Sequence, residues 1–498
     1  MTATDLGSAG PGEIDPHSLD FGEGILPIPR IDRYAGTGLM FWLWCGGNIL
    51  LTTFVLGGYY AAALGAVGMI VVTVAGSLLG NLFPSLSGLR SARYGVDEYV
   101  GMRSSFGTFG AYIGIFLLVA INFGWVGILS SIAGHSGAAV MATYHVTNFH
   151  WYSIFAIGCG IVLPVAMLYI SPKTVFGLVK VAVPILIVFA ALLLWKQLDR
   201  FGWGYISHIK ANHSVSWQYA LEANIAYAVS WFPYMGAWNR FAKTEKGAFW
   251  GAWLGLSFIA IMFAVVGGMA TLTTGSGDPS VWATKSGLGV PALGIIILST
   301  LINNAMLLYC SAKGIQTAWP KLRYHVVVGL VALPSIVFIY EGTLQNNFNT
   351  ILTVVGAFIA PYWGVALGDY FLVRHQRLDL VGLYQRDDSP YWFRGGFNVK
   401  ALAIWVCGVG LWIFLGGWTS TVSWVQIGSG EKVFAYLTAT APTIIVCAVA
   451  YWLVMLPSLR AHRRTDAPVR AREPVGGSAV GLTAPSTMGA VQPEMPPA

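Results

Sequence analysis

The sequence predicts an all-α integral membrane protein with twelve transmembrane helices. Of its 498 residues, 56% are hydrophobic and only 10% are charged, and the mean hydropathy is +0.65, which is not the composition of a soluble domain. Apolar runs of about 20 residues, the length that crosses a bilayer as a helix, recur along most of the chain. The twelve runs are 39–63, 65–87, 107–134, 152–170, 174–195, 219–240, 248–273, 289–318, 324–340, 347–373, 400–418 and 434–456.

The runs form one predicted transmembrane domain, residues 36–457, between two polar tails. The N-terminal tail, 1–35, begins with an acidic and polar stretch, so we expect no cleavable signal peptide and assign insertion to the first helix. The C-terminal tail, 458–498, is rich in Pro, Gly, Ala and Arg and has few aromatic residues. This composition predicts a disordered segment.

The distribution of basic residues predicts the orientation. With a cytoplasmic N-terminus, five of the 28 Lys and Arg fall outside and two within helices, which leaves 21 in cytoplasmic segments. This asymmetry follows the positive-inside rule, so the net charge of +7 needs no nucleic acid partner. We therefore expect a multi-pass protein of the plasma (cell inner) membrane, with both termini cytoplasmic.

The sixth run contains the motif AYAVSWFPYMGAWNRF, in which Pro233 falls at mid-membrane depth beside Trp231 and Tyr234. A proline inside a helix removes a backbone hydrogen bond and clashes with the preceding turn. Freed backbone groups are tolerated at this depth where they are buried in protein or line a cavity. The segment 230–234 is therefore the first candidate binding site.

The first run carries a second weak point, at Gly46 and Gly47, followed directly by Asn48. A polar amide at lipid depth usually faces the interior of the helix bundle. The two glycines are also explained by close helix packing, which leaves that alternative open for them. Packing does not require Asn48, so the amide favours a binding role.

Gly46 and Pro233 sit at comparable depths in the first and sixth runs. Two interrupted helices at corresponding places in two halves are typical of transporters built from inverted repeats. We predict repeat one at about 39–195, repeat two at about 219–373, and two additional helices at about 400–456. The expected activity is transport by alternating access.

Five motifs follow one another along the chain: GEGILPIPRIDRYAGTGLMFWLWCGGNILLTTFVLG, MRSSFGTFGAY with NFGW, SWFPYMGAWNRF, GAFIAPYWGVALGDYFLVR and YWFRGGFNVKALAIW. In order and spacing they resemble those of the nucleobase cation symporter-1 family of purine, cytosine, allantoin and hydantoin permeases. The resemblance spans nearly the whole membrane domain. It implies the leucine-transporter fold of five plus five helices with two more at the C-terminus, and import of a nucleobase or related flat heterocycle, with cytosine or a purine first.

The resemblance also implies site residues. A flat heterocycle would stack between Trp125 and Trp231, and stacking of a base on an aromatic side chain is worth about 1–3 kcal/mol. The alternative is that each tryptophan fills core volume, with Phe41 or Tyr234 as the stacking partner. From the eighth run, Asn303 or Asn304 would bind the substrate; the alternative for these amides is a hydrogen bond to a neighbouring helix backbone.

The chain departs from the family at several positions. Leu129 stands where relatives have Gln or Asn, which removes a hydrogen bond to the ring and leaves the substrate open. Ala237 and Asn239 replace an aspartate and a serine, although Arg240 is kept. We expect Pro233 and Arg240 to have gate or structural roles.

The coupling ion also stays open between sodium, a proton and none. Sodium-coupled relatives present a hydroxyl pair from helix 8; here Ser299 and Thr300 lie two residues early and would serve if that helix is shifted. Lys180, on the fifth run, could replace the sodium ion, or its long stem could reach the membrane surface instead. Beyond a sodium ion or a proton, we expect no cofactor and no bound metal.

Two acidic residues lie near membrane depth. Glu222 is near the outer end of the sixth run, and Asp369 is near the inner end of the tenth, five residues before Arg374. We expect end-of-helix pairs or gate contacts for both. The sequence shows no acid at the midplane, which favours a neutral substrate over a cationic one.

The sequence contains no nucleophile elbow, no H-E-x-x-H and no Cys/His cluster, so we expect no enzyme activity. A channel would not need helix breaks in matching halves. The alternative that stays open is a permease of the same fold for another small solute, such as a thiamine-precursor pyrimidine, allantoin or hydantoin, or an amino acid derivative. The expected partners are the heterocyclic substrate and the lipid bilayer, with the protein as a monomer.

Overall fold

The computed structural model describes residues 26–146, 149–170, 172–319, 321–340, 344–385, 389–416, 434 and 436–465. Helices make up the regular structure of these residues, and β pairing among them is limited to two isolated bridges. Residues up to Val454 form one compact unit, to which the packing described below belongs, and a second unit begins at Met455.

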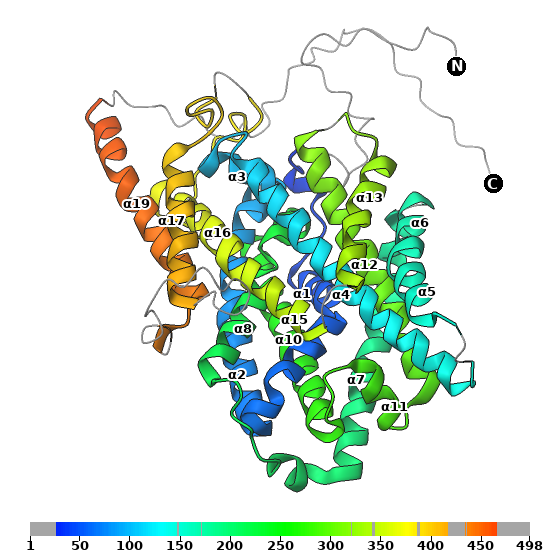
Figure 1. The fold of residues 1–498 in the computed structure, drawn as a ribbon. Helices are drawn as coiled ribbons and strands as arrows, with labels where there is room; N and C mark the ends of the chain where they lie inside the picture. The colour runs from blue at the N-terminus through cyan, green and yellow to red at the C-terminus, as the bar shows by residue number, and fades with distance from the viewer. Residues whose placement is uncertain are drawn as a thin grey trace, which may run out of the picture. The chain divides into compact units, whose positions relative to one another are not determined.

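Figure 1 shows the helices coloured in chain order. The first half of the described chain contains η2 Arg30–Asp32, α1 Thr37–Asn48, α2 Leu51–Tyr94, α3 Glu98–Phe106, α4 Ala111–Thr143, α5 Trp151–Ile157, η3 Gly158–Val162, α6 Leu163–Ile170, α7 Pro172–Ser207, α8 Trp217–Val229, η4 Phe232–Tyr234 and α9 Met235–Asn239. The second half contains α10 Glu245–Thr274, α11 Pro279–Lys285, α12 Gly289–Ala318, α13 Tyr324–Ala332, η5 Leu333–Ile336, α14 Val337–Tyr340, α15 Leu344–Val354, η6 Val355–Ile359, α16 Ala360–Leu367, η7 Gly368–Val373, α17 Val399–Gly416 and α19 Thr440–Thr465.

Nine helices in the described residues are long and apolar enough to cross a membrane. The difference from the expected twelve has a structural reason. Helix α2 counts once, although Gly65 has a φ of 70° and divides it where the sequence predicted the end of the first run. The segments 217–239 and 324–340 are apolar but are divided into shorter helices. The number twelve and the repeat arrangement therefore stay predictions.

The C-terminal end of the membrane domain differs from the prediction. Helix α19 begins at Thr440 and continues to Thr465, into the segment 458–498 that the composition predicted to be a disordered tail. Most of the predicted tails, 1–25 and 466–498, lies outside the described residues.

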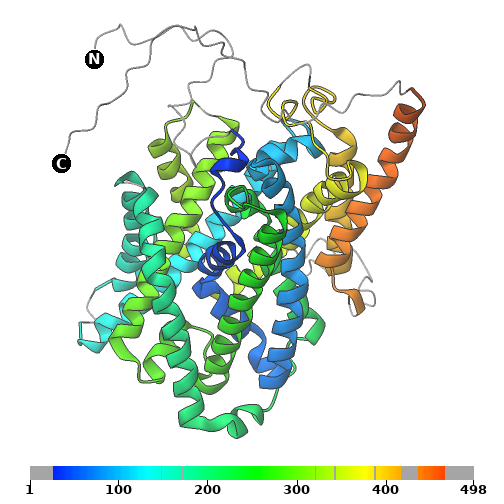
Figure 2. The ribbon, with the colours of Figure 1, turned by 180° about the vertical axis from the view of Figure 1, so that it is seen from behind.

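Glycines allow the two central helices to approach closely. Helices α2 and α10 run side by side (Figure 2). A Cβ on Gly57 would lie 1.7 Å from the carbonyl oxygen of Ala264, and one on Gly267 would lie 2.1 Å from that of Phe54. In lipid, where helix association depends on close packing, small residues at such contacts bring the backbones together. This contact fixes α10 beside the segment that follows α1.

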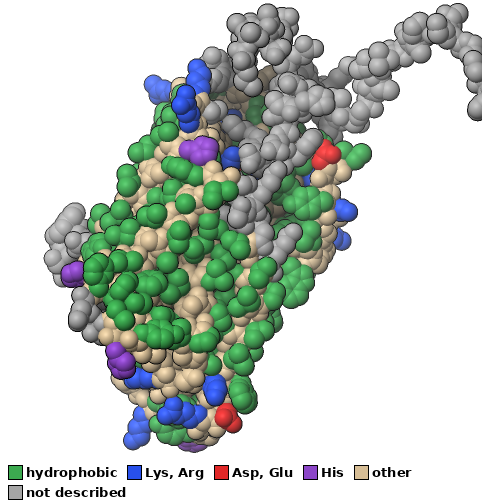
Figure 3. Space-filling view, turned by 90° about the vertical axis from the view of Figure 1, so that its right-hand side faces the viewer, with side chains coloured by type: hydrophobic (Ala, Val, Ile, Leu, Met, Phe, Trp, Pro, Cys, Tyr) green, Lys and Arg blue, Asp and Glu red, His purple; other side chains and the backbone are tan. Residues whose placement is uncertain are grey.

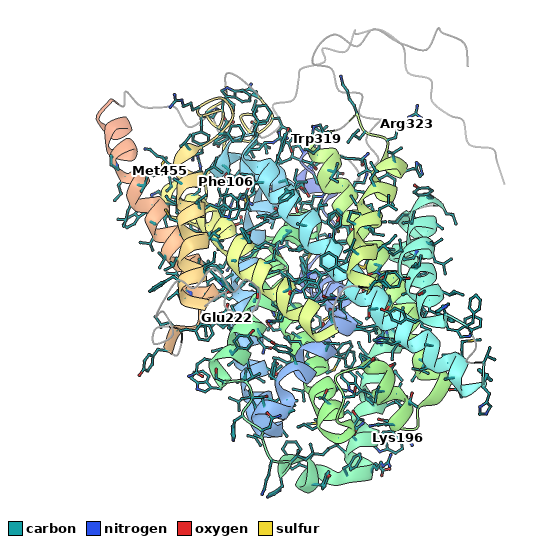
Figure 4. All side chains as sticks on the ribbon, in the orientation of Figure 1. Phe106, Lys196, Glu222, Trp319, Arg323 and Met455 are labelled. Carbon is teal, nitrogen blue, oxygen red and sulfur yellow. The ribbon has the colours of Figure 1, made fainter. Side chains whose placement is uncertain are left out.

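The surface of the described residues is apolar in its middle. Figure 3 shows hydrophobic side chains over the middle of one face, with charged side chains at its upper and lower ends. Exposed side chains such as those of Val67, Phe116 and Ile170 would be costly in water but suit lipid. Figure 4 places Phe106, Trp319 and Arg323 toward one end of the molecule and Lys196 toward the other.

Candidate functional site

The first helix breaks directly after Asn48. Helix α1 ends there, Ile49 has φ −73° and ψ 68°, and Leu50 is extended before α2 begins. The two glycines that the sequence singled out are still helical, so the interruption lies C-terminal to the predicted place. A Cβ on Gly47 would lie 3.9 Å from the Trp231 ring, an ordinary contact distance. Gly47 therefore lies against the sixth transmembrane segment rather than at the break.

The sixth segment breaks at the predicted position. Helix α8 ends at Val229, a turn follows, and Pro233 lies in the short 3-10 helix η4, which leads into α9. Pro233 is at the start of η4, where its missing N–H removes no helical hydrogen bond. Its carbonyl oxygen accepts a hydrogen bond of 3.0 Å from the Tyr99 hydroxyl of α3.

A pocket lies between the two breaks and α4. The space between atoms there is about 310 Å³, which includes space open to solvent. Three side chains selected from the sequence, those of Trp125, Trp231 and Tyr234, line it together. The full lining is Leu50, Thr52, Trp125, Leu129, Tyr227, Ser230, Trp231, Tyr234 and Leu307.

Aromatic rings hold the two tryptophans in place. The Trp125 ring meets the edges of Tyr227 and Phe348, each with centroids 5.7 Å apart. The Trp231 ring lies 5.4 Å from that of Tyr234. Both tryptophan side chains are buried in protein, with 6% and 7% of their surfaces exposed, so neither faces lipid. Phe41, the other stacking candidate, packs against Phe258 and does not line the pocket.

Asn48 holds the helix 1 break together. Its Nδ2 donates to the carbonyl oxygen of Leu256 on α10 at 2.7 Å, and its Oδ1 accepts from the Trp231 indole Nε1 at 3.2 Å. Asn48 therefore orients the Trp231 ring but does not itself line the pocket.

The two amides of α12 bind backbone groups. Asn303 Nδ2 donates to the Ile49 carbonyl oxygen at 3.2 Å and to Ser299 Oγ at 3.1 Å. Asn304 Nδ2 contacts the carbonyl oxygens of Val126 and Gly160 and the Ser130 hydroxyl. Neither amide lines the pocket, so the geometry favours the backbone alternative over direct substrate binding for both.

Asn122 is a residue that sequence reasoning missed. It lies one turn before Trp125 on α4 and is buried. Its Nδ2 donates to the Leu307 carbonyl oxygen at 3.1 Å and to Ser311 Oγ at 2.7 Å, and its Oδ1 accepts from the Tyr234 hydroxyl. Asn122 thus ties α4 and α12 to the helix 6 break. The sequence signal that could have identified it is an amide within an apolar run, three residues before Trp125.

The two hydroxyl residues predicted for ion coupling have different partners. Ser299 accepts from Asn303, while Thr300 donates to the Leu129 carbonyl oxygen at 3.3 Å, on another face of α12. Lys180 is on α7, but its side chain lies outside the described residues. No group of three or more metal-binding acidic, His or Cys side chains occurs among the residues that the structure describes.

A second cluster forms around α3, between the second and third apolar runs of the sequence. Glu98 Oε1 accepts from Arg90 Nη2 at 2.8 Å, Ser87 Oγ at 2.9 Å and the Trp363 indole at 2.8 Å. The Arg90 and Glu98 side chains are 2% and 0% exposed. A Cβ on Gly236 would lie 2.0 Å from the Glu98 backbone nitrogen, so α9 also packs against this cluster.

The two predicted helix-end acids both have partners. Asp369 Oδ2 accepts from Ser104, from Ser105 and from Arg374 Nε at 2.8 Å, which joins α3 to the end of the tenth transmembrane segment. Glu222 accepts from the backbone nitrogens of Ala439 and Thr440 and so caps the N-terminus of α19.

The third predicted gate or structural residue, Arg240, follows α9. It is buried, and its guanidinium lies 5.1 Å from the centre of the Phe241 ring.

Known proteins are similar to this chain over most of its length. Residues 27–436 match a family model described as permease for cytosine/purines, uracil, thiamine and allantoin. A purine-uracil permease of Arabidopsis thaliana is 28% identical over 449 residues, covering 83% of this chain and 74% of the relative. The cytosine permease of Escherichia coli K12 is 24% identical, covering 72% and 82% of the two chains. A hydantoin permease of Microbacterium maritypicum is 22% identical, covering 76% and 81%.

Solved structures show the same fold. Mhp1, a nucleobase-cation-symport-1 family transporter, superimposes in a closed conformation with bromovinylhydantoin bound at a TM-score of 0.71, with 18% identity over 90% of this chain and 97% of Mhp1. Its inward-facing conformation gives a TM-score of 0.73, with 18% identity over 91% and 94%.

Proposed function

Because the chain belongs to the family of permeases for cytosine/purines, uracil, thiamine and allantoin, we propose that its central pocket binds a nucleobase or related flat heterocycle. The protein is a secondary transporter of the nucleobase type and not an enzyme. In this proposal cytosine or a purine is the substrate, and it is imported by alternating access. The alternative is another family solute, such as a thiamine-precursor pyrimidine, allantoin or a hydantoin.

One observation carries the proposal: Trp125 and Trp231 line the same pocket, between two interrupted helices. The irregular backbone of the two breaks is tolerated at this depth because it borders a pocket. The rigid indole faces suit a planar ring. Leu129 and Leu307 add apolar surface to the lining. Trp125, Trp231 and Tyr234 therefore form the substrate site in this proposal, with Asn48 and Gly47 supporting Trp231.

The proposed arrangement has two inverted repeats, about 39–195 and 219–373, with two further helices at about 400–456. The placement of Phe106, Trp319 and Arg323 opposite Lys196 supports it (Figure 4). We assign the end with Arg323 to the cytoplasm, because the positive-inside rule places most basic residues there. The protein acts as a monomer in the plasma membrane, with both termini cytoplasmic.

Uptake in whole cells tests the proposal. Cells that lack endogenous nucleobase transport and express this protein should accumulate radiolabelled cytosine or adenine above the vector control. Unlabelled cytosine, adenine, uracil, hydantoin, allantoin and hydroxymethylpyrimidine are then compared as competitors. Competition by allantoin or hydroxymethylpyrimidine alone would favour the alternative. Accumulation of none of these compounds, with the protein present in the membrane, would refute a heterocycle pocket.

For the coupling ion we propose a proton. Two oxygen acceptors, the Ile49 carbonyl at the helix 1 break and the Ser299 hydroxyl on α12, both receive hydrogen bonds from the Asn303 amide. A sodium ion needs several such oxygen ligands at once. The Thr300 hydroxyl does not join them, because it donates a hydrogen bond to the Leu129 carbonyl oxygen. The donor amide thus fills the position between these oxygens that a cation would need.

Uptake should therefore persist when choline replaces sodium, at half of the original rate or more, and an uncoupler should abolish it. Asn303→Asp offers a matched test, because an added carboxylate would favour a cation there and should make uptake stimulated by sodium. Strict sodium dependence of the unaltered protein would contradict the proposal and indicate that Ser299 and the Ile49 carbonyl bind the ion.

A further inference from the structure

At the helix 1 break, the carbonyl oxygen of Asn48 accepts hydrogen bonds and determines how nearby hydroxyl groups are oriented. The Asn48 carbonyl oxygen accepts from the Leu50 backbone nitrogen at 2.8 Å and from Thr53 Oγ1 at 3.0 Å. A carbonyl oxygen can accept a hydrogen bond but cannot donate one. The single hydroxyl hydrogen of Thr53 is therefore committed to Asn48.

This commitment sets the direction of the next two hydrogen bonds. The Tyr227 hydroxyl lies 2.7 Å from Thr53 Oγ1 and 3.1 Å from Thr52 Oγ1. Because Thr53 has no hydrogen left, Tyr227 must donate to it. The hydrogen of Tyr227 is then used, and Thr52 must donate to Tyr227. A relay runs from Thr52 through Tyr227 and Thr53 to the Asn48 carbonyl.

The other two hydroxyl groups of the pocket are also committed as donors. Ser230 Oγ donates to the Tyr227 carbonyl oxygen at 2.5 Å. The Tyr234 hydroxyl donates to Asn122 Oδ1, and the orientation of that amide is fixed because its Nδ2 faces the Leu307 carbonyl oxygen. The four hydroxyl-bearing residues that line the pocket, Thr52, Tyr227, Ser230 and Tyr234, can thus offer a ligand acceptors but no hydroxyl hydrogen.

We propose that the pocket selects heterocycles that present an amino group as an N–H donor to these hydroxyl oxygens. Thr53 is the positioning residue: it does not line the pocket, but it fixes the direction of the relay. This inference rests on the proposed function of the pocket. A ring with a methyl group or an acceptor in place of the donor leaves a hydroxyl oxygen without a partner and binds more weakly.

Pairs of ligands of matched size test the selection. Adenine and 6-methylpurine differ in one amino group, as do cytosine and 4-methylpyrimidin-2-one. As competitors of the labelled base, the amino compounds should be more potent by roughly 3- to 10-fold for each hydrogen bond that is lost. The measurement is the ratio of half-inhibitory concentrations within each pair, which does not depend on the amount of protein in the membrane.

Thr53→Val removes the hydroxyl but keeps the shape of the side chain. The hydrogen of Tyr227 is then free to turn toward Thr52, whose own hydrogen becomes available to a ligand. The preference for amino compounds should fall several-fold toward a ratio of one. Thr53→Ser keeps the hydroxyl and should keep the preference of the unaltered protein. Loss of side-chain packing alone would change the amount of transport but not this ratio.

Thr52→Val provides a second test if Thr53→Val does not reach the membrane, because it removes one acceptor from the pocket and should also lower the ratio. Normal ratios in both valine variants would overturn the role of the relay. Equal potency of amino and methyl compounds in the unaltered protein would overturn donor selection while uptake itself still supported the proposed function. Absence of any heterocycle uptake would instead refute the proposed function.

Discussion

Replacing Arg90 by methionine is expected to lower the free energy of unfolding by about 3–5 kcal/mol, because it leaves a buried carboxylate without its counter-charge. Arg90 and Glu98 form an ion pair of 2.8 Å in which both side chains are almost completely buried. Burial raises the pKa of the Glu98 carboxyl, and the Arg90 charge opposes that rise. Without Arg90, the carboxyl either stays charged at a high cost or takes up a proton. Thermal unfolding in detergent measures the loss.

Arg93 offers a matched control on the same helix. It pairs with Glu245 at 2.7 Å, but these side chains are 32% and 31% exposed. Exposed pairs contribute about 0–1 kcal/mol, so Arg93→Met should unfold at nearly the temperature of the unaltered protein. Adding Glu98→Gln to Arg90→Met removes the unpaired charge and should recover much of the loss. If Arg90→Met and Arg93→Met are equally stable, the ion pair does not support the fold as described.

The Glu98 cluster connects stability to transport. Helix α3 binds α2 through Arg90, and it reaches the helix 6 break through the hydrogen bond from Tyr99 to the Pro233 carbonyl oxygen. Trp363 and Asp369 connect α3 to the tenth transmembrane segment. Substitutions in this cluster are therefore expected to reduce uptake as well as stability.

The sequence located the helix 6 break because its cause is local. Pro233 lacks an N–H and restricts its own backbone, so neighbouring segments are not needed to explain the interruption. The helix 1 break depends on tertiary contacts instead. Gly46 and Gly47 stay helical, and the chain opens at Ile49, whose carbonyl oxygen is held by Asn303. A glycine costs a helix only about 1 kcal/mol, which packing easily offsets.

The hydrogen-bond partners of the buried amides could not be predicted from the sequence either, because they also depend on tertiary contacts. Trp125 and Trp231 could be selected because a tryptophan at mid-depth is unusual. Asn304 and Asn122 look equally available in the sequence, yet Asn304 binds backbone oxygens whereas Asn122 holds Tyr234 beside the pocket. The direction of an amide depends on which groups neighbouring helices bring to it.

The arginines between the second and third apolar runs show the same limit. Arg90 and Arg93 lie one helical turn apart there. The structure buries Arg90 against Glu98 and leaves Arg93 partly exposed. Sequence position predicted the side of the membrane for both residues, but burial depends on α3 packing over α2. The folding of that segment back onto the bundle has no sequence signature as clear as a proline.

Trp231→Ala is expected to reduce uptake at low substrate concentration by about 5- to 150-fold, the equivalent of the 1–3 kcal/mol that base stacking contributes. The ring lines the pocket, and its indole nitrogen donates to Asn48 at the helix 1 break. Its loss therefore removes a stacking surface and a link between the two broken helices. Initial rates of labelled-base uptake, normalised to protein in the membrane, measure the effect.

Two further variants separate the contributions of the ring. Trp231→Phe keeps an aromatic face but cannot donate to Asn48, so its uptake should fall between those of the alanine variant and the unaltered protein. Trp250→Ala is the matched control, because Trp250 is 47% exposed and its ring packs against those of Phe249 and Trp253 on the same helix. It should transport normally. Equal uptake by Trp231→Ala and Trp250→Ala would show that Trp231 is a packing residue, and the substrate would have to bind elsewhere.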